Sequence, residues 1–217
     1  MLAASSLRHV FQDIGAAYEK KHPGVKVRFS FAGSQQLATQ VRQGQPADVL
    51  ATADTETMDG LRSETGGKPV RFAKNRLTIA TAPHNPEHIR GLHDLSRKDL
   101  KVVLAAKKVP VGRYGRDVLR KQHVSVHPAS QESDVASVLS KVQLGEADAG
   151  LVYVTDATSA GGKVGTVRVP DAQNAVADYP AAPLKQSKHA KQAAGFTRYL
   201  TSTPAQKLLR KAGFQKP

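Results

Sequence analysis

The stretch LRHVFQDIGAAYEKKHPGVKVRFSF, residues 7–31, decides the fold class. Its first part repeats apolar residues at helical spacing until His22-Pro23-Gly24 interrupts the pattern, which predicts an amphipathic helix over residues 7–21. Its second part, residues 25–31, alternates apolar and polar side chains, as is typical of a half-buried strand. A further short helix and a further strand follow before residue 54. Helix and strand in such quick succession predict an α/β fold.

The rest of the chain continues this alternation. Gly, Pro and polar residues separate short apolar segments, and no internal repeat or low-complexity stretch is found. The patterns predict a short helix or turn over residues 94–99, helices over 35–43, 55–61, 114–121, 135–142, 189–201 and 204–212, and strands over 47–53, 76–82, 101–105, 124–127, 149–154, 164–169 and 179–184.

The composition excludes several kinds of protein. The 217 residues include no Cys, which excludes disulfides, thiolate metal sites and thiol catalysis. No segment has the roughly 18 consecutive apolar residues of a membrane-spanning helix, and residues 1–6 lack the charged and apolar regions expected of a signal peptide. The motifs of α/β-hydrolases, phosphate-binding loops and zinc proteases are also absent, so no enzyme activity is expected.

Two groups of polar residues suggest chemistry at first sight. His84, His88 and His93 lie close in sequence, but a Pro and a Gly between them break the helix that would align them, which favours a surface loop over a metal site. Asp48 and Asp54 resemble paired carboxylates. We expect them to hold strand ends and loops rather than to catalyse a reaction.

The charge of the chain favours anionic partners. Lys and Arg number 32 against 18 Asp and Glu, a formal net charge of +14. Such a field attracts nucleic acid, anionic lipid and small oxyanions alike, and it is also compatible with an ordinary solvated surface. The basic residues are scattered, no block of five or six forms a basic arm, and only 5% of the residues are aromatic. Both features weaken the nucleic-acid interpretation.

Four predicted helix starts carry small polar residues or glycine. Backbone N–H groups at a helix N-terminus lack partners within the helix and lie at its positive end, so they can bind an anion. Each start is equally well explained as an ordinary helix cap, and sequence spacing does not show that the four converge. They are Ser6, Ser34, Val111-Gly112 and Ser133-Asp134-Val135.

Several ordered motifs over nearly the whole chain resemble one family. They resemble the molybdate-binding proteins of ABC importers, in their actinobacterial form, within the type II periplasmic-binding-protein superfamily. The motifs are Ala3-Ala4-Ser5-Ser6-Leu7, Phe31-Ala32-Gly33-Ser34 with Leu37-Ala38, Gly44-Gln45-Pro46-Ala47-Asp48-Val49 with Ala53-Asp54, Val109-Pro110-Val111-Gly112, Gly145 to Tyr153 with Asp156-Ala157, and Ala212-Gly213-Phe214.

The resemblance implies an oxyanion site without any further metal or cofactor. In that family two Ser hydroxyls, backbone amides at helix starts and one Tyr hydroxyl hold the anion. A deprotonated tetrahedral dianion only accepts hydrogen bonds, so a site built of donors suits it, whereas a protonated phosphate would leave its own O–H unpaired. Carried over to this chain, the donors are the side chains of Ser6, Ser34 and Tyr153 and the amides of Val111 and Val135.

Arg113 follows the Val111-Gly112 amides where many members of the family have a neutral residue. Two roles are open for it. Its guanidinium either points into solvent or adds a charge-assisted contact to the anion. In the first case, the basic field only steers the anion toward the site.

The resemblance also implies a two-lobed α/β fold with the ligand in a cleft between the lobes. Residues 1–77 plus 181–217 are expected to form one lobe and residues 78–180 the other, with the strands over 76–82 and 179–184 as the hinge. The lobes would close on the ligand, since each supplies donors.

The function implied is capture of molybdate or tungstate and delivery to a membrane permease. We expect a monomer, exported to the periplasm or to the outer face of the cytoplasmic membrane, that binds no nucleic acid. The alternatives are a binding protein for another oxyanion, such as sulfate, and a basic nucleic-acid-binding protein.

Overall fold

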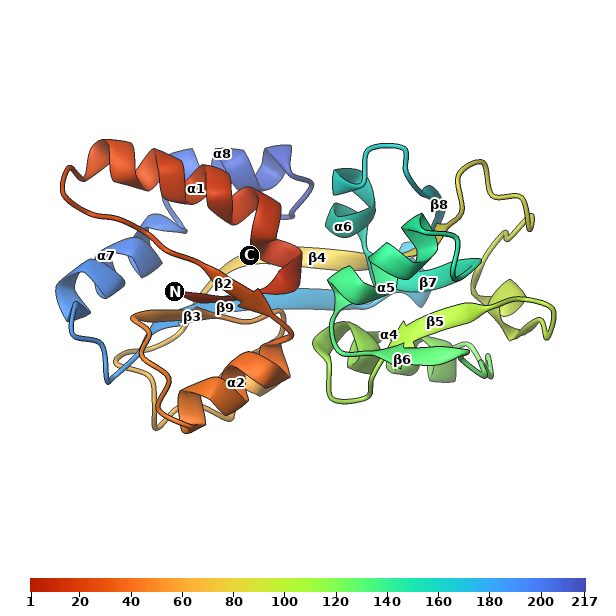
Figure 1. Ribbon diagram of the computed structural model, residues 1–217, viewed down its shortest axis with the longest axis horizontal. Coiled ribbons are helices and arrows are strands. Elements are labelled where there is room, and N and C mark those ends of the chain that lie inside the picture. Colours follow the sequence, from red (N-terminus) through yellow and green to blue (C-terminus); the bar gives the residue numbers. More distant parts are fainter. The chain divides into compact units, whose positions relative to one another are not determined.

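The computed structural model describes residues 1–217, which form two compact units (Figure 1). Unit 1 consists of Met1–Lys74 and Asp178–Pro217, and unit 2 of Asn75–Ala177. The sequence placed the boundaries at 77/78 and 180/181. Two long strands, β4 (Val70–Thr81) and β9 (Val176–Pro183), each continue from one unit into the other.

Unit 1 is built on a mixed sheet in the order β2-β1-β3-β9. The strand β1 pairs in parallel with both β2 and β3, and β3 pairs antiparallel with β9. The elements of unit 1 are β1 (Leu2–Ala4), a 3₁₀ turn (Ser5–Leu7), α1 (Arg8–Lys21), β2 (Ser30–Ala32), α2 (Ser34–Arg42), β3 (Val49–Ala51), α3 (Thr55–Asp59), α7 (Ala190–Tyr199) and α8 (Thr203–Lys211), together with parts of β4 and β9.

The core of unit 1 explains the pattern of its first helix. One face of α1 buries Val10, Phe11, Ile14 and Tyr18. The ring of Phe11 lies among three other phenylalanine rings with centroids 5.7–6.5 Å away, which is the normal range for packed aromatic pairs. The apolar period of residues 7–21 therefore reflects burial against the sheet.

Unit 2 has a sheet in which β7, β5 and β6 lie side by side. The strand β5 pairs in parallel with β6 and β7, whereas β4 pairs antiparallel with β7 and β8. The elements of unit 2 are a 3₁₀ turn (Leu92–Ser96), β5 (Val102–Ala105), α4 (Pro110–Lys121), β6 (Ser130–Glu132), α5 (Val135–Gln143), β7 (Ala149–Tyr153), α6 (Val154–Ser159), β8 (Gly165–Arg168) and a 3₁₀ turn (Asp171–Gln173).

Several predicted elements differ from the structure. The strand predicted over 124–127 is wrong: the chain there is irregular, and the strand beside β5 is β6, at Ser130–Glu132. Of the strand predicted over 25–31, only Ser30 and Phe31 belong to β2, because its neighbour β1 begins at Leu2, which pairs with Ser30. The α/β class is confirmed.

No helix is both long enough and apolar enough to cross a membrane.

Candidate anion-binding site

Ser6 lies in unit 1, in the 3₁₀ turn that directly follows β1. Its side chain is only half-buried, and its Oγ lies 3.1 Å from the hydroxyl oxygen of Tyr179, a buried residue of β9. Either oxygen can donate in this hydrogen bond. The contact between β1 and β9 therefore holds the Ser6 hydroxyl near the end of its strand.

Ser34 is the first residue of α2, and Gly33 is its N-cap. The sequence had placed Ser34 before the helix, so the predicted capping role belongs to its neighbour. The Ser34 side chain is 1% exposed, and its Oγ accepts the N–H of Ala53 at 3.0 Å. Because a hydroxyl has one proton, this geometry leaves the Ser34 O–H to donate to another acceptor.

The strand topology brings Ser6 and Ser34 to the same edge of the unit 1 sheet. Ala4 pairs with Ala32 in parallel, and each serine follows its alanine by two residues. Ala53, the partner of Ser34, follows the parallel strand β3 in the same way. The carboxyl ends of parallel strands are where open α/β sheets bind ligands.

Val111 lies in the first turn of α4, which begins at Pro110 rather than at Tyr114 as predicted. The first hydrogen bond within this helix runs from the Arg113 N–H to the Val109 carbonyl at 2.9 Å. The N–H groups of Val111 and Gly112 precede it and have no acceptor inside the helix. The helix N-terminus thus presents two amide donors at its positive end.

Gly112 is required by the way α4 leaves β5. A Cβ at this position would lie 2.2 Å from the carbonyl oxygen of Ala106 and 2.6 Å from that of Ala105. Only glycine therefore lets the first turn of the helix approach the preceding loop so closely. Sequence reasoning had noted Gly112 only as part of a motif.

Val135 is the first residue of α5, and Asp134 is its N-cap. The Asp134 carboxylate accepts the N–H of Ser137 at 2.9 Å and is 3.2 Å from the Ser137 hydroxyl. This cap satisfies the third amide of the helix and leaves the amide of Val135 in front of it.

Tyr153 ends β7 and is the N-cap of α6, a helix that the sequence did not predict. Its side chain is 1% exposed, and its N–H donates to the carboxylate of Asp156 at 3.1 Å. The strand predicted through residue 154 stops at Tyr153 because this bond turns the chain into α6.

Unit 2 brings Val111, Val135 and Tyr153 to one edge of its sheet. They follow β5, β6 and β7, in that order, and β5 is parallel to both of its neighbours. The structure thus gathers the predicted residues in two sets, one in each unit. Ser6 and Ser34 form the first set, and these three residues form the second.

Arg113 is half-buried, and its guanidinium donates to the Lys108 carbonyl at 2.8 Å. This bond ties the side chain to the loop that precedes α4. Whether Arg113 contacts an anion or only contributes to the field stays a prediction.

Asp156 is a buried acid that sequence reasoning did not select. Burial raises the pKa of its carboxyl to about 7; the hydrogen bond from the Tyr153 N–H opposes the rise, and the negative charge of Asp134 adds to it. The signal in the sequence was the spacing of Tyr153 and Asp156, since an acid three residues after a helix cap commonly bonds to the N–H of the cap.

No group of three or more His, Cys, Asp or Glu side chains in residues 1–217 is arranged to hold a metal ion.

Comparisons with known proteins identify the family. Residues 1–215 match the family described as bacterial extracellular solute-binding protein. The molybdate-binding protein ModA of Mycobacterium tuberculosis is 42% identical over 219 residues, which cover 100% of this chain and 84% of that protein.

Solved structures agree on the fold. The periplasmic molybdate-binding protein of Azotobacter vinelandii superimposes with a TM-score of 0.83 at 18% identity, covering 100% of this chain and 98% of that one. The sulfate-binding protein SubI of Mycobacterium tuberculosis gives a TM-score of 0.85 at 20% identity, covering 99% and 85%. The match over almost the whole length, with the 42% identity to a full-length relative, shows that this chain belongs to the bacterial extracellular solute-binding protein family.

Proposed function

We propose that this protein is the substrate-binding component of an ABC importer for molybdate or tungstate, which it delivers to a membrane permease. The observation that carries the proposal is the donor set at the carboxyl ends of parallel strands, in a chain 42% identical to a molybdate-binding protein. The proposal includes an exported monomer that catalyses no reaction.

The donor set matches the chemistry of a fully deprotonated oxyanion. The five predicted groups are three hydroxyls and two main-chain amides at helix starts. Each can donate, and a dianion can accept from all of them without a buried counter-charge. We propose that the donors of both units bind the same anion, which predicts one anion per chain.

Sulfate is the second candidate, because it is also a tetrahedral dianion that accepts hydrogen bonds only. The likeness to a sulfate-binding protein at 20% identity shows the shared fold and does not favour sulfate as the ligand. The 42% identity to a molybdate-binding relative favours molybdate.

Thermal unfolding with four anions tests the proposal. Molybdate and tungstate should stabilise the protein at micromolar concentrations by about 2.7 kcal/mol at a hundredfold excess over Kd, which corresponds to roughly 5–10 °C in Tm for a chain of this size. Sulfate should have a weak effect and phosphate almost none. Equal shifts for all four anions would indicate a nonspecific basic surface and contradict the proposal.

Removal of one hydroxyl from each unit tests the donor assignment. Ser34→Ala and Tyr153→Phe should each weaken molybdate binding by about 1.5–3 kcal/mol, the range for hydrogen bonds to charged groups. Isothermal titration of each variant measures the change.

The two variants should differ in stability. Ser34→Ala leaves the Ala53 N–H buried without its acceptor and should also cost about 1–3 kcal/mol of folding free energy. Tyr153→Phe keeps the backbone bond to Asp156. Tyr199→Phe is the matched control, since that hydroxyl is buried in unit 1 without a hydrogen-bond partner. Unchanged affinity in Tyr153→Phe would remove Tyr153 from the site.

A further inference from the structure

Three helices of unit 1 pack into one layer. The ring of Tyr18, on α1, lies 5.1 Å from the ring of Phe196 and 5.0 Å from that of Tyr199, both on α7. The helix α8 packs against α1 as well. The apolar faces of these helices point inward, so their outer faces are exposed together.

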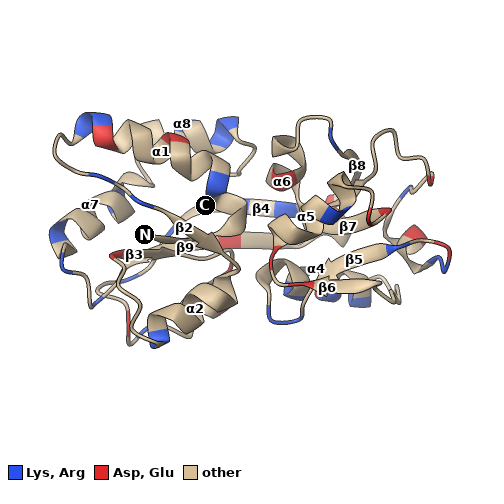
Figure 2. Ribbon diagram, viewed as in Figure 1, with Lys and Arg blue, Asp and Glu red and all other residues tan.

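The outer face of this layer is strongly basic. Unit 1 has 18 Lys and Arg against 8 Asp and Glu, whereas unit 2 has 14 against 10. From residue 185 to the end of the chain there is no acidic residue, and Figure 2 shows acidic positions in this layer only on α1. We call the exposed basic residues of the three helices the basic layer; they are Lys20, Lys21, Lys191, Arg198, Lys207, Arg210 and Lys211.

The basic layer has no internal counter-charges. None of its seven side chains forms an ion pair. The acid Glu19 on α1 is already paired with Lys26 at 2.9 Å, which leaves Asp13 as the one exposed acid of the three helices. The positive potential of the layer is therefore directed at solvent and at whatever approaches it.

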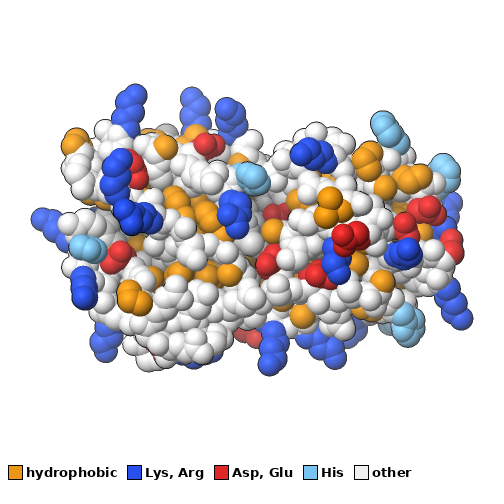
Figure 3. Space-filling view, viewed as in Figure 1, with side chains coloured by type: hydrophobic (Ala, Val, Ile, Leu, Met, Phe, Trp, Pro, Cys, Tyr) orange, Lys and Arg blue, Asp and Glu red, His pale blue; other side chains and the backbone are white.

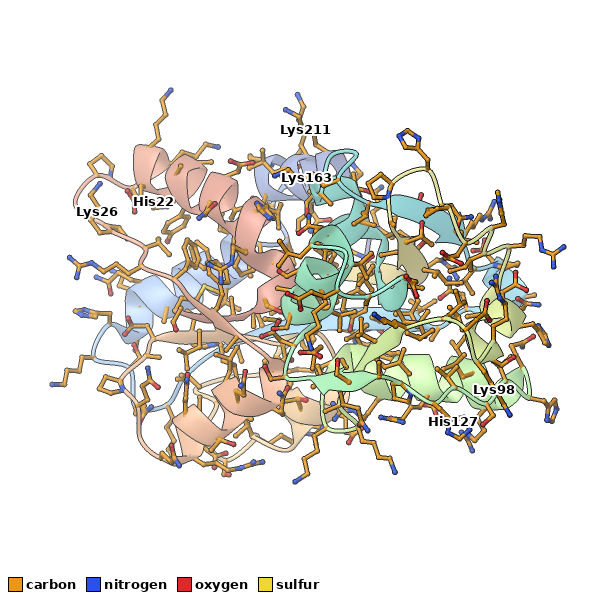
Figure 4. All side chains as sticks on the ribbon, turned by 45° about the vertical axis from the view of Figure 1, so that its right-hand side comes forward. His22, Lys26, Lys98, His127, Lys163 and Lys211 are labelled. Atoms are coloured by element: carbon orange, nitrogen blue, oxygen red, sulfur yellow. The ribbon has the colours of Figure 1, made fainter.

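The layer lacks the anchors of a specific protein interface. Protein interfaces centre on buried aromatic or apolar residues, but the exposed large hydrophobic residues of this chain are Leu144, Val154 and Val176, none of which is in the layer. Long basic side chains project from the surface over α1 and α8 (Figure 3), and Lys211 extends away from the end of α8 (Figure 4).

We propose that the basic layer docks on an anionic bilayer surface. Charge complementarity selects this occupant: five of the seven residues are lysines, whose flexible ammonium groups suit a dense, mobile array of lipid phosphates better than a fixed protein surface. Docking would hold the protein at the membrane between rounds of anion delivery. The inference rests on the layer alone and does not depend on which anion the protein carries.

Vesicle sedimentation with charge-reversal variants tests the proposal. One variant combines Lys191→Glu, Lys207→Glu and Lys211→Glu. Its control combines Lys98→Glu, Lys121→Glu and Lys163→Glu, three exposed lysines of unit 2 without ion pairs, so both variants lose the same net charge. Phosphatidylcholine vesicles with and without phosphatidylglycerol are used in about 0.1 M salt, where the Debye length is about 10 Å.

The unmodified protein should bind only the vesicles that contain phosphatidylglycerol. Each basic residue near an anionic surface contributes about fivefold to partitioning, so the layer variant should bind at least about a hundredfold less while the control stays within about tenfold. Equal losses in both variants would mean that net charge alone acts, and would overturn the proposal. Equal binding to neutral vesicles, or no binding at all, would overturn it as well.

Two parallel measurements separate other causes. Molybdate titration of both variants should show unchanged affinity, so a failure of the anion proposal is seen independently of the vesicle result. Binding to a short DNA duplex is measured under the same salt. If the layer variant loses DNA binding while vesicle binding is kept, the occupant is a nucleic acid and the lipid proposal is wrong.

Discussion

Asp156→Asn is expected to make the protein more stable than the unmodified chain above pH 7 and to leave it equally stable near pH 4. The carboxyl of Asp156 has its pKa raised from 3.8 to about 7, chiefly by burial. The folded protein therefore binds a proton that the unfolded chain has lost between these two values. Stability from this group is fully present below pH 3.8 and is lost as the pH rises through about 7.

The size of the effect follows from the two pKa values. At 1.36 kcal/mol per pH unit, the difference corresponds to about 4 kcal/mol. Asparagine resembles the protonated acid and keeps an oxygen that can accept the Tyr153 N–H, so the variant should lack this pH dependence. Urea unfolding of both proteins without ligand, from pH 4 to pH 8.5, measures the difference directly.

Asp117→Asn is the control, because that carboxyl is exposed on α4 and paired only with Arg120. Its effect should stay within about 1 kcal/mol at every pH, as expected of a surface ion pair. A constant difference between Asp156→Asn and the unmodified protein over the whole range would show that Asp156 is charged in the folded state even at low pH, contrary to its burial.

Gly112→Ala is expected to destabilise unit 2 by about 3 kcal/mol or more and to weaken anion binding. The new methyl group would lie 2.2 Å and 2.6 Å from two backbone carbonyl oxygens, which cannot rotate away as a side chain can. Overpacking commonly costs about 1–3 kcal/mol, and a clash with backbone on both sides belongs at the upper end. Relief requires α4 to shift, which would move the amide of Val111.

Gly115→Ala on the same helix is the matched control. Its methyl group would lie 3.1 Å from the Leu151 Cδ1, the end of a flexible side chain, and alanine also favours helix by about 1 kcal/mol. Stability of Gly115→Ala should therefore change little, with molybdate affinity unaltered. Denaturant unfolding and titration compare the two variants, and similar stability in both would contradict the close approach of α4 to β5.

Local signals in the sequence predicted the parts of the fold that depend on neighbouring residues. The helix over 7–21 and the two closing helices have apolar periods that match the buried faces of α1, α7 and α8. The α/β class followed from their alternation with strands. The ordered motifs indicated the family, which the comparisons confirm, and they named Ser6 and Ser34 before any strand pairing was known.

What the sequence could not predict depends on residues far apart in the chain. Residues 124–127 alternate like a strand, but β5 pairs instead with Ser130–Glu132, because strand pairing is a long-range choice that a local pattern does not contain. The need for glycine at 112 arises from Ala105 and Ala106 folding back on the helix start. The raised pKa of Asp156 likewise depends on burial and on Asp134 from another helix. The sequence determined which donors the protein carries, and only the tertiary structure decided which of them share a sheet edge, since parallel pairing aligns strand ends that lie up to fifty residues apart.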